Sequence, residues 1–181
     1  MGRVAITGGI ATGKSTVLEV LQQQGYTTAS ADSFAREVFL LPEVQKELSL
    51  AVGIPRPIEA ADLRRAILAD TRVRRTVNRI THPRILARIQ ACTEQFIEVP
   101  LLIETCLQGR FRAVWVVVCD PQTQLERLQK KLGDAAQAAK LIAAQLPLDV
   151  KTPFADLTVR TNDPPATVQR YVRGVAGDFI D

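Results

Sequence analysis

The sequence has few of the residues that mark metal clusters, disulfide scaffolds or membrane spans. It contains one histidine and three cysteines in 181 residues, and no two cysteines form a C-x-x-C pair. Three unpaired cysteines are typical of reduced thiols in a cytosolic protein, so we expect the chain in the cytoplasm. No apolar run approaches the roughly 20 residues that a membrane helix needs. A signal peptide is not expected, because an apolar strand begins almost at Met1. We therefore expect no membrane association.

Aromatic residues are also scarce, at 5% of the chain, and none lies in the arginine-rich segment from Arg64 to Arg88. That segment holds 8 of the 17 arginines of a chain whose net charge is +4. Segments that bind nucleic acid usually add aromatic side chains that stack on bases, so we expect no nucleic-acid partner. The arginines suit either the phosphates of a small molecule or a solvated helix face, and we favour the helix face for most.

The most informative feature that is present is a phosphate-binding loop with the pattern G-x-x-x-x-G-K-[ST], from Gly8 to Ser15. Gly8 and Gly13 allow backbone conformations and close approaches that a Cβ would block. The N–H groups of the loop then converge on phosphate oxygens at the start of the next helix. Lys14 reaches the β- and γ-phosphates, and the Ser15 hydroxyl is a ligand for Mg²⁺. The sequence therefore predicts a site for a nucleoside triphosphate.

Apolar runs alternate with helical patterns along the whole chain. The alternation predicts an α/β fold, a five-stranded parallel sheet with helices on both faces. Breaks within the helical part are predicted at Gly53–Pro57 and at His82-Pro83, where Pro83 suits the first turn of a new helix. Strands are predicted at residues 3–7, 26–31, 96–101, 113–119 and 155–159.

A phosphate-binding loop alone does not distinguish a switch, a motor and a kinase. GTP-binding switches usually carry D-x-x-G and N-K-x-D, which are absent here, and motor ATPases usually need a longer chain. A small phosphoryl-transfer kinase remains, in which helical insertions supply an acceptor lobe and a lid that excludes water. We expect a single P-loop kinase domain over residues 1–181, with a core at 1–33, 96–120 and 151–181, a helical acceptor-binding insertion at 34–95, and a lid at 121–150.

Such a kinase needs a carboxylate beside the γ-phosphate. Asp32 is the best candidate, because it ends the second strand on the edge where ligands bind in open α/β sheets. It would accept or orient the proton of the attacking hydroxyl, and capping of the next helix is its alternative role. Asp120 ends an apolar strand as a metal-binding Walker B carboxylate does, but Pro121 favours helix capping. Glu98 and Glu104 flank the third strand, and either is suited to orient a metal-bound water.

Further motifs follow the loop in the same order as in one kinase family. They are Ala31-Asp32, His82-Pro83, the string V-P-L-L-I-E from Val99 to Glu104, Gln124 to Arg127, the spacing from Gln145 to Lys151, and Ala155-Asp156. Together with the loop they resemble dephospho-coenzyme A kinases over nearly the whole chain. The resemblance implies transfer of the γ-phosphoryl group of ATP to the ribose 3′-hydroxyl of dephospho-coenzyme A. The products are coenzyme A and ADP, and the reaction is the last step of coenzyme A synthesis.

The resemblance also implies roles for single residues. Asp32 corresponds to the family's proposed base, and Lys14 and the lid residue Arg127 supply positive charge to the transferred group. Where the family often has Asp and Arg, this chain has Ser30 and Lys131. ATP contacts carry over to Gly8, Gly9, Ala11, Thr12, Gly13, Lys14, Ser15 and Thr16, with Ser15 on Mg²⁺. Acceptor contacts are expected at Asp32, His82, Leu101 and Glu104, although His82 is also explained as a structural helix-start residue.

Two other functions remain open. One is a small kinase for another nucleotide or a sugar, and the V-P-L-L-I-E string speaks against it. The other is a nucleotide-dependent binding module without kinase activity, and the intact Lys14, Ser15 and Asp32 speak against that. We expect a monomer whose partners are the small-molecule substrates ATP and dephospho-coenzyme A.

Overall fold

A computed structural model describes residues 2–180, and the chain divides into two compact units. The first unit contains the chain up to Ser30 and again from Glu94, and the second unit is Ala31–Thr93. Each unit has its own hydrophobic core. Within the described residues, no helix is long and apolar enough to cross a membrane.

The first unit is built on a five-stranded parallel sheet with the strand order β2-β3-β1-β4-β5. This confirms the predicted sheet. Pairing of Val4 with both Phe96 and Ala113 places β1 in the centre, so its carboxyl end opens at the middle of one sheet edge. The strands are β1 (Val4–Gly8), β2 (Thr28–Ser30), β3 (Phe96–Glu98), β4 (Ala113–Val118) and β5 (Leu157–Arg160).

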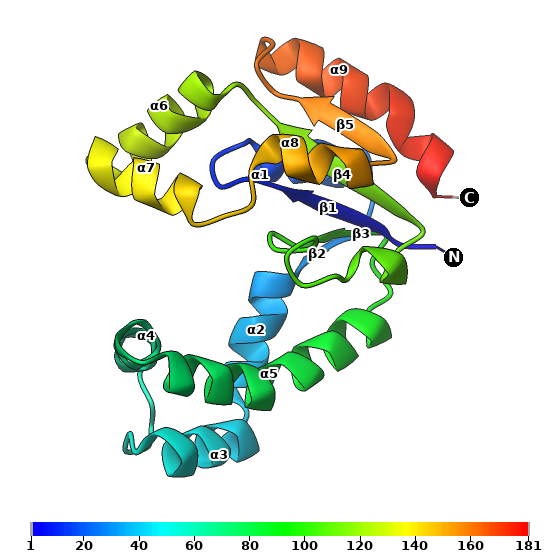
Figure 1. Cartoon of the computed structure of the whole chain (residues 1–181). Coiled ribbons are helices and arrows are strands. Elements are labelled where there is room, and N and C mark those ends of the chain that lie inside the picture. The colour runs from blue at the N-terminus through cyan, green and yellow to red at the C-terminus, as the bar shows by residue number, and fades with distance from the viewer. Residues whose placement is uncertain (1, 181) are drawn as a thin grey trace. The chain divides into compact units, whose positions relative to one another are not determined.

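Two helices cover one face of this sheet and a short helix lies over the other (Figure 1). α1 (Lys14–Gln23) and α9 (Pro165–Val175) pack on the first face, around Trp115, which has no exposed surface. The Trp115 ring meets Phe96 edge to face at 5.2 Å between ring centroids. β4 is buried on both faces, as its uninterrupted apolar sequence predicts. The opposite face carries α8 (Leu148–Lys151).

Between β4 and α8 the chain forms two helices that pack on each other. α6 (Pro121–Leu132) begins with a proline in its first turn and ends at Gly133, which has a φ of 76°. α7 (Ala135–Ala143) begins after Asp134, whose side chain accepts hydrogen bonds from two N–H groups of its first turn. Short 3-10 turns complete the first unit at Gln108–Arg110, Thr152–Phe154 and Ala176–Phe179.

The second unit consists of four helices around Val38, Val44, Leu48 and their neighbours. α5 runs without interruption through Pro83, so the predicted start of a new helix at His82-Pro83 is wrong. The chain breaks instead at Asp70, whose side chain accepts a hydrogen bond from the Arg72 N–H. The helices are α2 (Ala31–Leu40), α3 (Pro42–Val52), α4 (Ala60–Ala69) and α5 (Thr71–Ala91).

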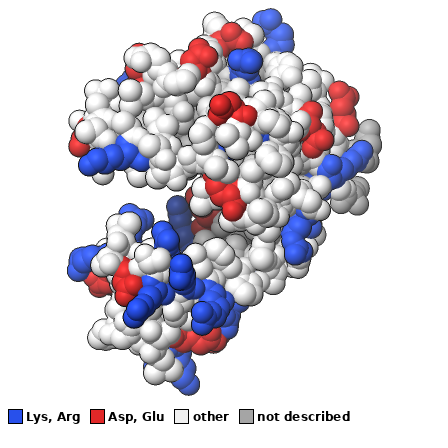
Figure 2. Space-filling model, in the orientation of Figure 1, with Lys and Arg blue, Asp and Glu red and all other residues white. Residues whose placement is uncertain are grey.

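Positive side chains gather over this helical unit (Figure 2). Arg84 and Arg88 form ion pairs with Glu47 and Glu37, at 2.6 and 3.2 Å, and so join α5 to α3 and α2. These two arginines stabilise the unit itself. Eight further arginines of the unit are exposed, namely Arg36, Arg56, Arg64, Arg65, Arg72, Arg74, Arg75 and Arg79.

Candidate active site

The phosphate-binding loop joins β1 to α1 and therefore lies at the carboxyl end of the central strand of the sheet. Gly8 has a φ of 147°, and a Cβ there would lie 2.3 Å from the Val117 carbonyl oxygen. Gly13 has a φ of 95° and precedes the first residue of α1. Both glycines are therefore required by conformation, and Gly8 also by space. The loop turns its backbone toward the start of α1, where N–H groups without helical partners bind anions.

Lys14 folds back over this loop. Its Nζ donates a hydrogen bond to the Gly9 carbonyl oxygen at 2.9 Å and lies 3.9 Å from Glu98 Oε1. Its side chain is almost buried, whereas Ser15 beside it is exposed. The structure thus combines a buried positive charge with an accessible hydroxyl in the first turn of α1, and this pair suits a phosphate and a metal ion respectively.

A cavity of 370 Å³ opens beside the loop. Arg127 reaches it from α6 and is held on Thr161, which follows β5. The Arg127 Nη1 donates to the Thr161 hydroxyl at 2.9 Å, and Nη2 donates to the Thr161 carbonyl at 2.6 Å. The same hydroxyl donates to the Thr12 carbonyl at 2.6 Å, which connects the arginine to the loop. The cavity is lined by Ala11, Gly13, Ser15, Thr16, Arg127, Lys131, Thr161, Asp163, Pro165 and Val168.

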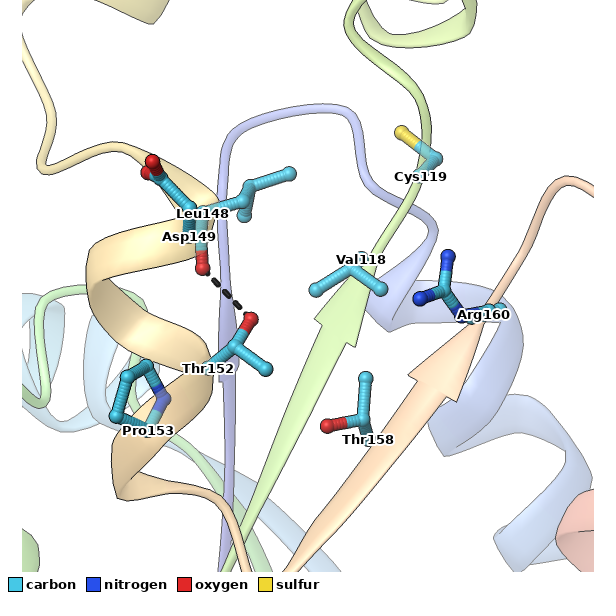
Figure 3. A pocket seen from close by; sticks show the side chains of 8 residues that line it. All are labelled: Val118, Cys119, Leu148, Asp149, Thr152, Pro153, Thr158 and Arg160. Atoms are coloured by element: carbon cyan, nitrogen blue, oxygen red, sulfur yellow. Dashed lines mark hydrogen bonds between the residues drawn. The ribbon is translucent and has the colours of Figure 1, made fainter.

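A second cavity, of 470 Å³, lies between the ends of β4 and β5 and α8 (Figure 3). Cys119 lies at the top of that view and Arg160 at its right, and on the left the Thr152 hydroxyl donates to the Leu148 carbonyl. Burial raises the pKa of the Cys119 thiol, and the nearby Arg127 guanidinium opposes that rise. The thiol therefore stays protonated at neutral pH.

Asp120, one of the carboxylates singled out in the sequence, bonds to Asn162 rather than to its own helix. The Asp120 backbone N–H donates to Asn162 Oδ1 at 3.1 Å, and Asn162 Nδ2 donates to Asp120 Oδ2 at 2.6 Å. Asp120 does occupy the N-cap position of α6, but its side chain makes no capping hydrogen bond. The expected capping bond is therefore replaced by a bridge between the segments that follow β4 and β5.

Glu104 pairs with a lysine that has no exposed surface. Lys151 Nζ lies 2.7 Å from Glu104 Oε1, which also accepts a hydrogen bond from the Leu146 N–H at 3.3 Å. The pair joins the loop after β3 to α8. Leu101, from the same V-P-L-L-I-E string, is 45% exposed. The sequence shows the spacing from Gln145 to Lys151, but no local pattern assigns Lys151 a role.

Asp32 and His82 belong to the second unit. Asp32 is an exposed residue in the first turn of α2, two residues beyond the end of β2, so it lies within the helix rather than capping it. His82 is an exposed residue in the interior of α5. Among residues 2–180, no three His, Cys, Asp or Glu side chains gather to hold a metal ion.

A parallel sheet with this strand order, a phosphate-binding loop after its central strand and an arginine beside that loop define a P-loop kinase. The sequence model of the family described as dephospho-CoA kinase matches residues 3–166. A dephospho-CoA kinase of Geobacter metallireducens is 32% identical over 186 residues, covering 93% of this chain and 92% of the relative. The chain belongs to the dephospho-CoA kinase family.

Solved structures agree on the fold. A Thermus thermophilus protein superposes with a TM-score of 0.83 at 21% identity, covering 98% of this chain and 97% of the other. The dephospho-CoA kinase from Campylobacter jejuni gives a TM-score of 0.66 at 20% identity, with 99% and 97% covered. At these identities the likeness concerns the fold alone, and it confirms the predicted kinase architecture.

Proposed function

We propose that this chain transfers the γ-phosphoryl group of ATP to the ribose 3′-hydroxyl of dephospho-coenzyme A, forming coenzyme A and ADP. The observation that carries this proposal is the family match over residues 3–166, since that range includes the loop, the V-P-L-L-I-E string and Arg127 together. The reaction is then the final step of coenzyme A synthesis.

The donor side of the reaction is assigned to the loop. The loop N–H groups and Lys14 would hold the β- and γ-phosphates of ATP. Mg²⁺ fits the residues present, because the Ser15 hydroxyl is exposed beside the cavity and Glu98 adds a carboxylate close to Lys14. When bound, Mg²⁺ neutralises part of the charge on the phosphate oxygens. Gly8, Gly9, Ala11, Thr12, Gly13 and Thr16 supply the remaining ATP contacts, and Thr12 can do so only through its backbone, since its side chain is buried.

The transferred group passes through a loose transition state whose charge is spread over the equatorial oxygens, so catalysis depends on fixed positive charge. Lys14 supplies one such charge and Arg127 another. The planar guanidinium of Arg127 is oriented by two hydrogen bonds to Thr161 before any substrate arrives. Lys131 lines the same cavity one helical turn further on, where the family often has arginine. A lid formed by residues 121–150 would carry both charges and exclude water.

Asp32 is assigned the role of orienting or accepting the proton of the 3′-hydroxyl. The support is connectivity: β2 is parallel to β1 within one sheet, and Asp32 follows Ser30, the last residue of β2, by two positions. The carboxyl ends of parallel strands face one edge, where ligands bind in this class of sheet. The insertion at residues 34–95 is assigned to the acceptor, with contacts at His82 and, from the segment after β3, at Leu101 and Glu104.

The proposal also includes the compartment and the partners of the enzyme. The three cysteines are free thiols in the structure, which suits a reducing compartment, and we assign the enzyme to the cytoplasm. ATP and dephospho-coenzyme A are its small-molecule partners, and a monomer is the proposed working form. Neither nucleic acid nor a membrane takes part in this proposal.

The test is ADP release from Mg·ATP with and without dephospho-coenzyme A. Dephospho-coenzyme A should stimulate ADP release far above the background rate, and coenzyme A should appear in equal amount. The Lys14→Met variant serves as the matched inactive control, because it removes the charge with little change of shape. A panel of nucleotide and sugar acceptors runs in parallel. Stimulation by one of these instead of dephospho-coenzyme A would overturn the assignment.

A further inference from the structure

Two glutamine side chains hold a single residue of the phosphate-binding loop, Ile10, through its N–H and its carbonyl. Gln145 Oε1 accepts a hydrogen bond from the Ile10 N–H at 2.8 Å, and Gln124 Nε2 donates one to the Ile10 carbonyl, also at 2.8 Å. We propose that Gln124 and Gln145 act as a pair of positioning residues, the glutamine clamp. The clamp fixes the first half of the loop and ties both ends of residues 125–144 to it. This inference rests on the proposed kinase reaction.

The two amides are used in opposite senses. A backbone N–H only donates and a backbone carbonyl only accepts, so Gln145 must present its oxygen and Gln124 its nitrogen to Ile10. Gln124 is 5% exposed, and Gln145 and Ile10 are half-buried. A buried peptide group that loses its partner carries a cost that water does not fully offset. Each glutamine therefore fixes one polar group of Ile10 that the loop's own turns leave unpaired in the described structure.

The space around Gly9 also supports the contact between Gln124 and the loop. A Cβ at Gly9 would lie 2.6 Å from Gln124 Nε2 and 3.3 Å from Leu148 Cδ2. Unlike Gly8 and Gly13, Gly9 has no positive φ, so its conformation does not call for glycine. Space does: any side chain at this position would displace the amide of Gln124.

The position of the clamp in the chain gives it a mechanical role. Gln124 lies in the first turn of α6, and Gln145 follows α7. Residues 125–144 therefore begin next to a contact with the Ile10 carbonyl and end next to a contact with the Ile10 N–H. The returning end has a second anchor, because the Leu146 N–H donates to Glu104, which pairs with buried Lys151. Segments that open and close over a substrate move about fixed terminal residues. The clamp supplies those fixed points and places them on the loop that holds the triphosphate.

The chemistry of the two hydrogen bonds gives matched variants. Gln145→Glu keeps an oxygen for the Ile10 N–H, whereas Gln124→Glu sets an acceptor against the Ile10 carbonyl with no proton between them. Both variants add one negative charge beside the same residue, Ile10, so the added charge largely cancels in their comparison. Gln145→Met removes the acceptor without adding charge. Gln129→Glu, on the exposed surface of α6, is the control for charge on this segment.

The first readout is the dissociation constant for Mg·ATP, measured by calorimetry without acceptor. We expect Gln124→Glu and Gln145→Met to raise the dissociation constant about tenfold. Gln145→Glu should raise it clearly less than Gln124→Glu does. The Gln129→Glu control should match the wild type. Equal effects of the two Glu variants would overturn the clamp. If Gln124→Glu does not fold, Gln145→Met against Gln145→Glu still tests the clamp through the hydrogen bond from the Ile10 N–H to Gln145.

The second readout compares two fates of the γ-phosphoryl group, which are transfer to water and transfer to dephospho-coenzyme A. It is the ratio of ADP formed without coenzyme A to ADP formed together with coenzyme A. Loosened ends of residues 125–144 admit water, so the ratio should rise severalfold in Gln145→Met. Variants that are less stable to urea but keep the wild-type dissociation constant and ratio would show a merely structural role and overturn the proposal. Failure of the wild type to respond to dephospho-coenzyme A would instead overturn the proposed reaction, while the Mg·ATP dissociation constants would still decide on the clamp.

Discussion

The buried ion pair of Lys151 and Glu104 predicts an unequal response to two conservative substitutions. Lys151 has no exposed surface, whereas the Glu104 side chain is 19% exposed and also accepts the Leu146 N–H. Glu104→Gln leaves an ammonium group in the interior with no counter-charge. Lys151→Met leaves a carboxylate that keeps the hydrogen bond from the Leu146 N–H and belongs to a side chain that is 19% exposed. Because an isolated buried charge is the more costly of the two, Glu104→Gln should destabilise the fold more than Lys151→Met does.

The expected magnitudes follow from that difference in exposure. Removing one partner of a buried pair costs about 3 to 5 kcal/mol, and Glu104→Gln should fall in this range. Lys151→Met should cost about 2 kcal/mol, because the remaining carboxylate keeps one hydrogen bond and its side chain is partly exposed. For a chain of this length, the melting temperature of Glu104→Gln should fall by roughly 10 °C. The double variant should lose less than the sum of the two single losses, by about 2 kcal/mol.

Urea unfolding followed by tryptophan fluorescence measures these free energies. Trp115 is the only tryptophan and is fully buried, so its emission reports loss of the core of the first unit. Thr105→Val is a neighbouring control, because it changes the exposed residue that directly follows Glu104 and removes hydrogen bonds to local carbonyls but no charge. Equal stability of Glu104→Gln and wild type, or a larger loss in Lys151→Met, would refute the reasoning from burial. Additive losses in the double variant would show that the two groups do not interact.

Four further predictions concern the reaction and the Cys119 thiol. Asp32→Asn should lower turnover by about two to four orders of magnitude and spare ATP binding; a large loss of ATP affinity with intact turnover would remove Asp32 from its role. Arg127→Lys keeps the charge but not the paired contacts to Thr161, so kcat should fall about tenfold to a hundredfold, and steady-state kinetics equal to wild type would contradict this. Cys119, whose pKa is raised by burial, should react with a thiol reagent at pH 8 roughly a hundredfold more slowly than exposed Cys106. Because the fold favours the neutral thiol, Cys119 stabilises it below pH about 9 and loses that contribution as the pH rises further, so Cys119→Ala should flatten the alkaline decline seen by urea unfolding.

The features predictable from sequence are those carried by local patterns. The loop from Gly8 to Ser15 predicts its own conformation, because its glycines and Lys14 stand at fixed spacings. The apolar run from Ala113 predicts a buried strand, and the Gly53–Pro57 break separates α3 from α4 as expected. The strand order and both cores follow from packing that no local pattern records.

The errors and omissions arise from tertiary contacts. Pro83 signals a helix start, yet packing of α5 against α2, α3 and α4 carries the helix through it. Asp120 is a good cap by type, but Asn162, 42 residues away, takes its side chain. Gln124 and Gln145 carry no local sign of a shared partner at Ile10. The spacing from Gln145 to Lys151 was visible in the sequence, but not that both residues anchor one returning segment.

The contact between Lys14 and Gly9 makes nucleotide binding an exchange reaction. The ammonium group already has a carbonyl oxygen at 2.9 Å and a carboxylate at 3.9 Å, so an incoming phosphate must replace partners rather than fill an empty place. Only a ligand with enough negative charge gains from that replacement, since a weakly charged one offers no better partner than Glu98 does. With Lys14 in its proposed role, the resting contacts of this one lysine would therefore favour a triphosphate over a monophosphate.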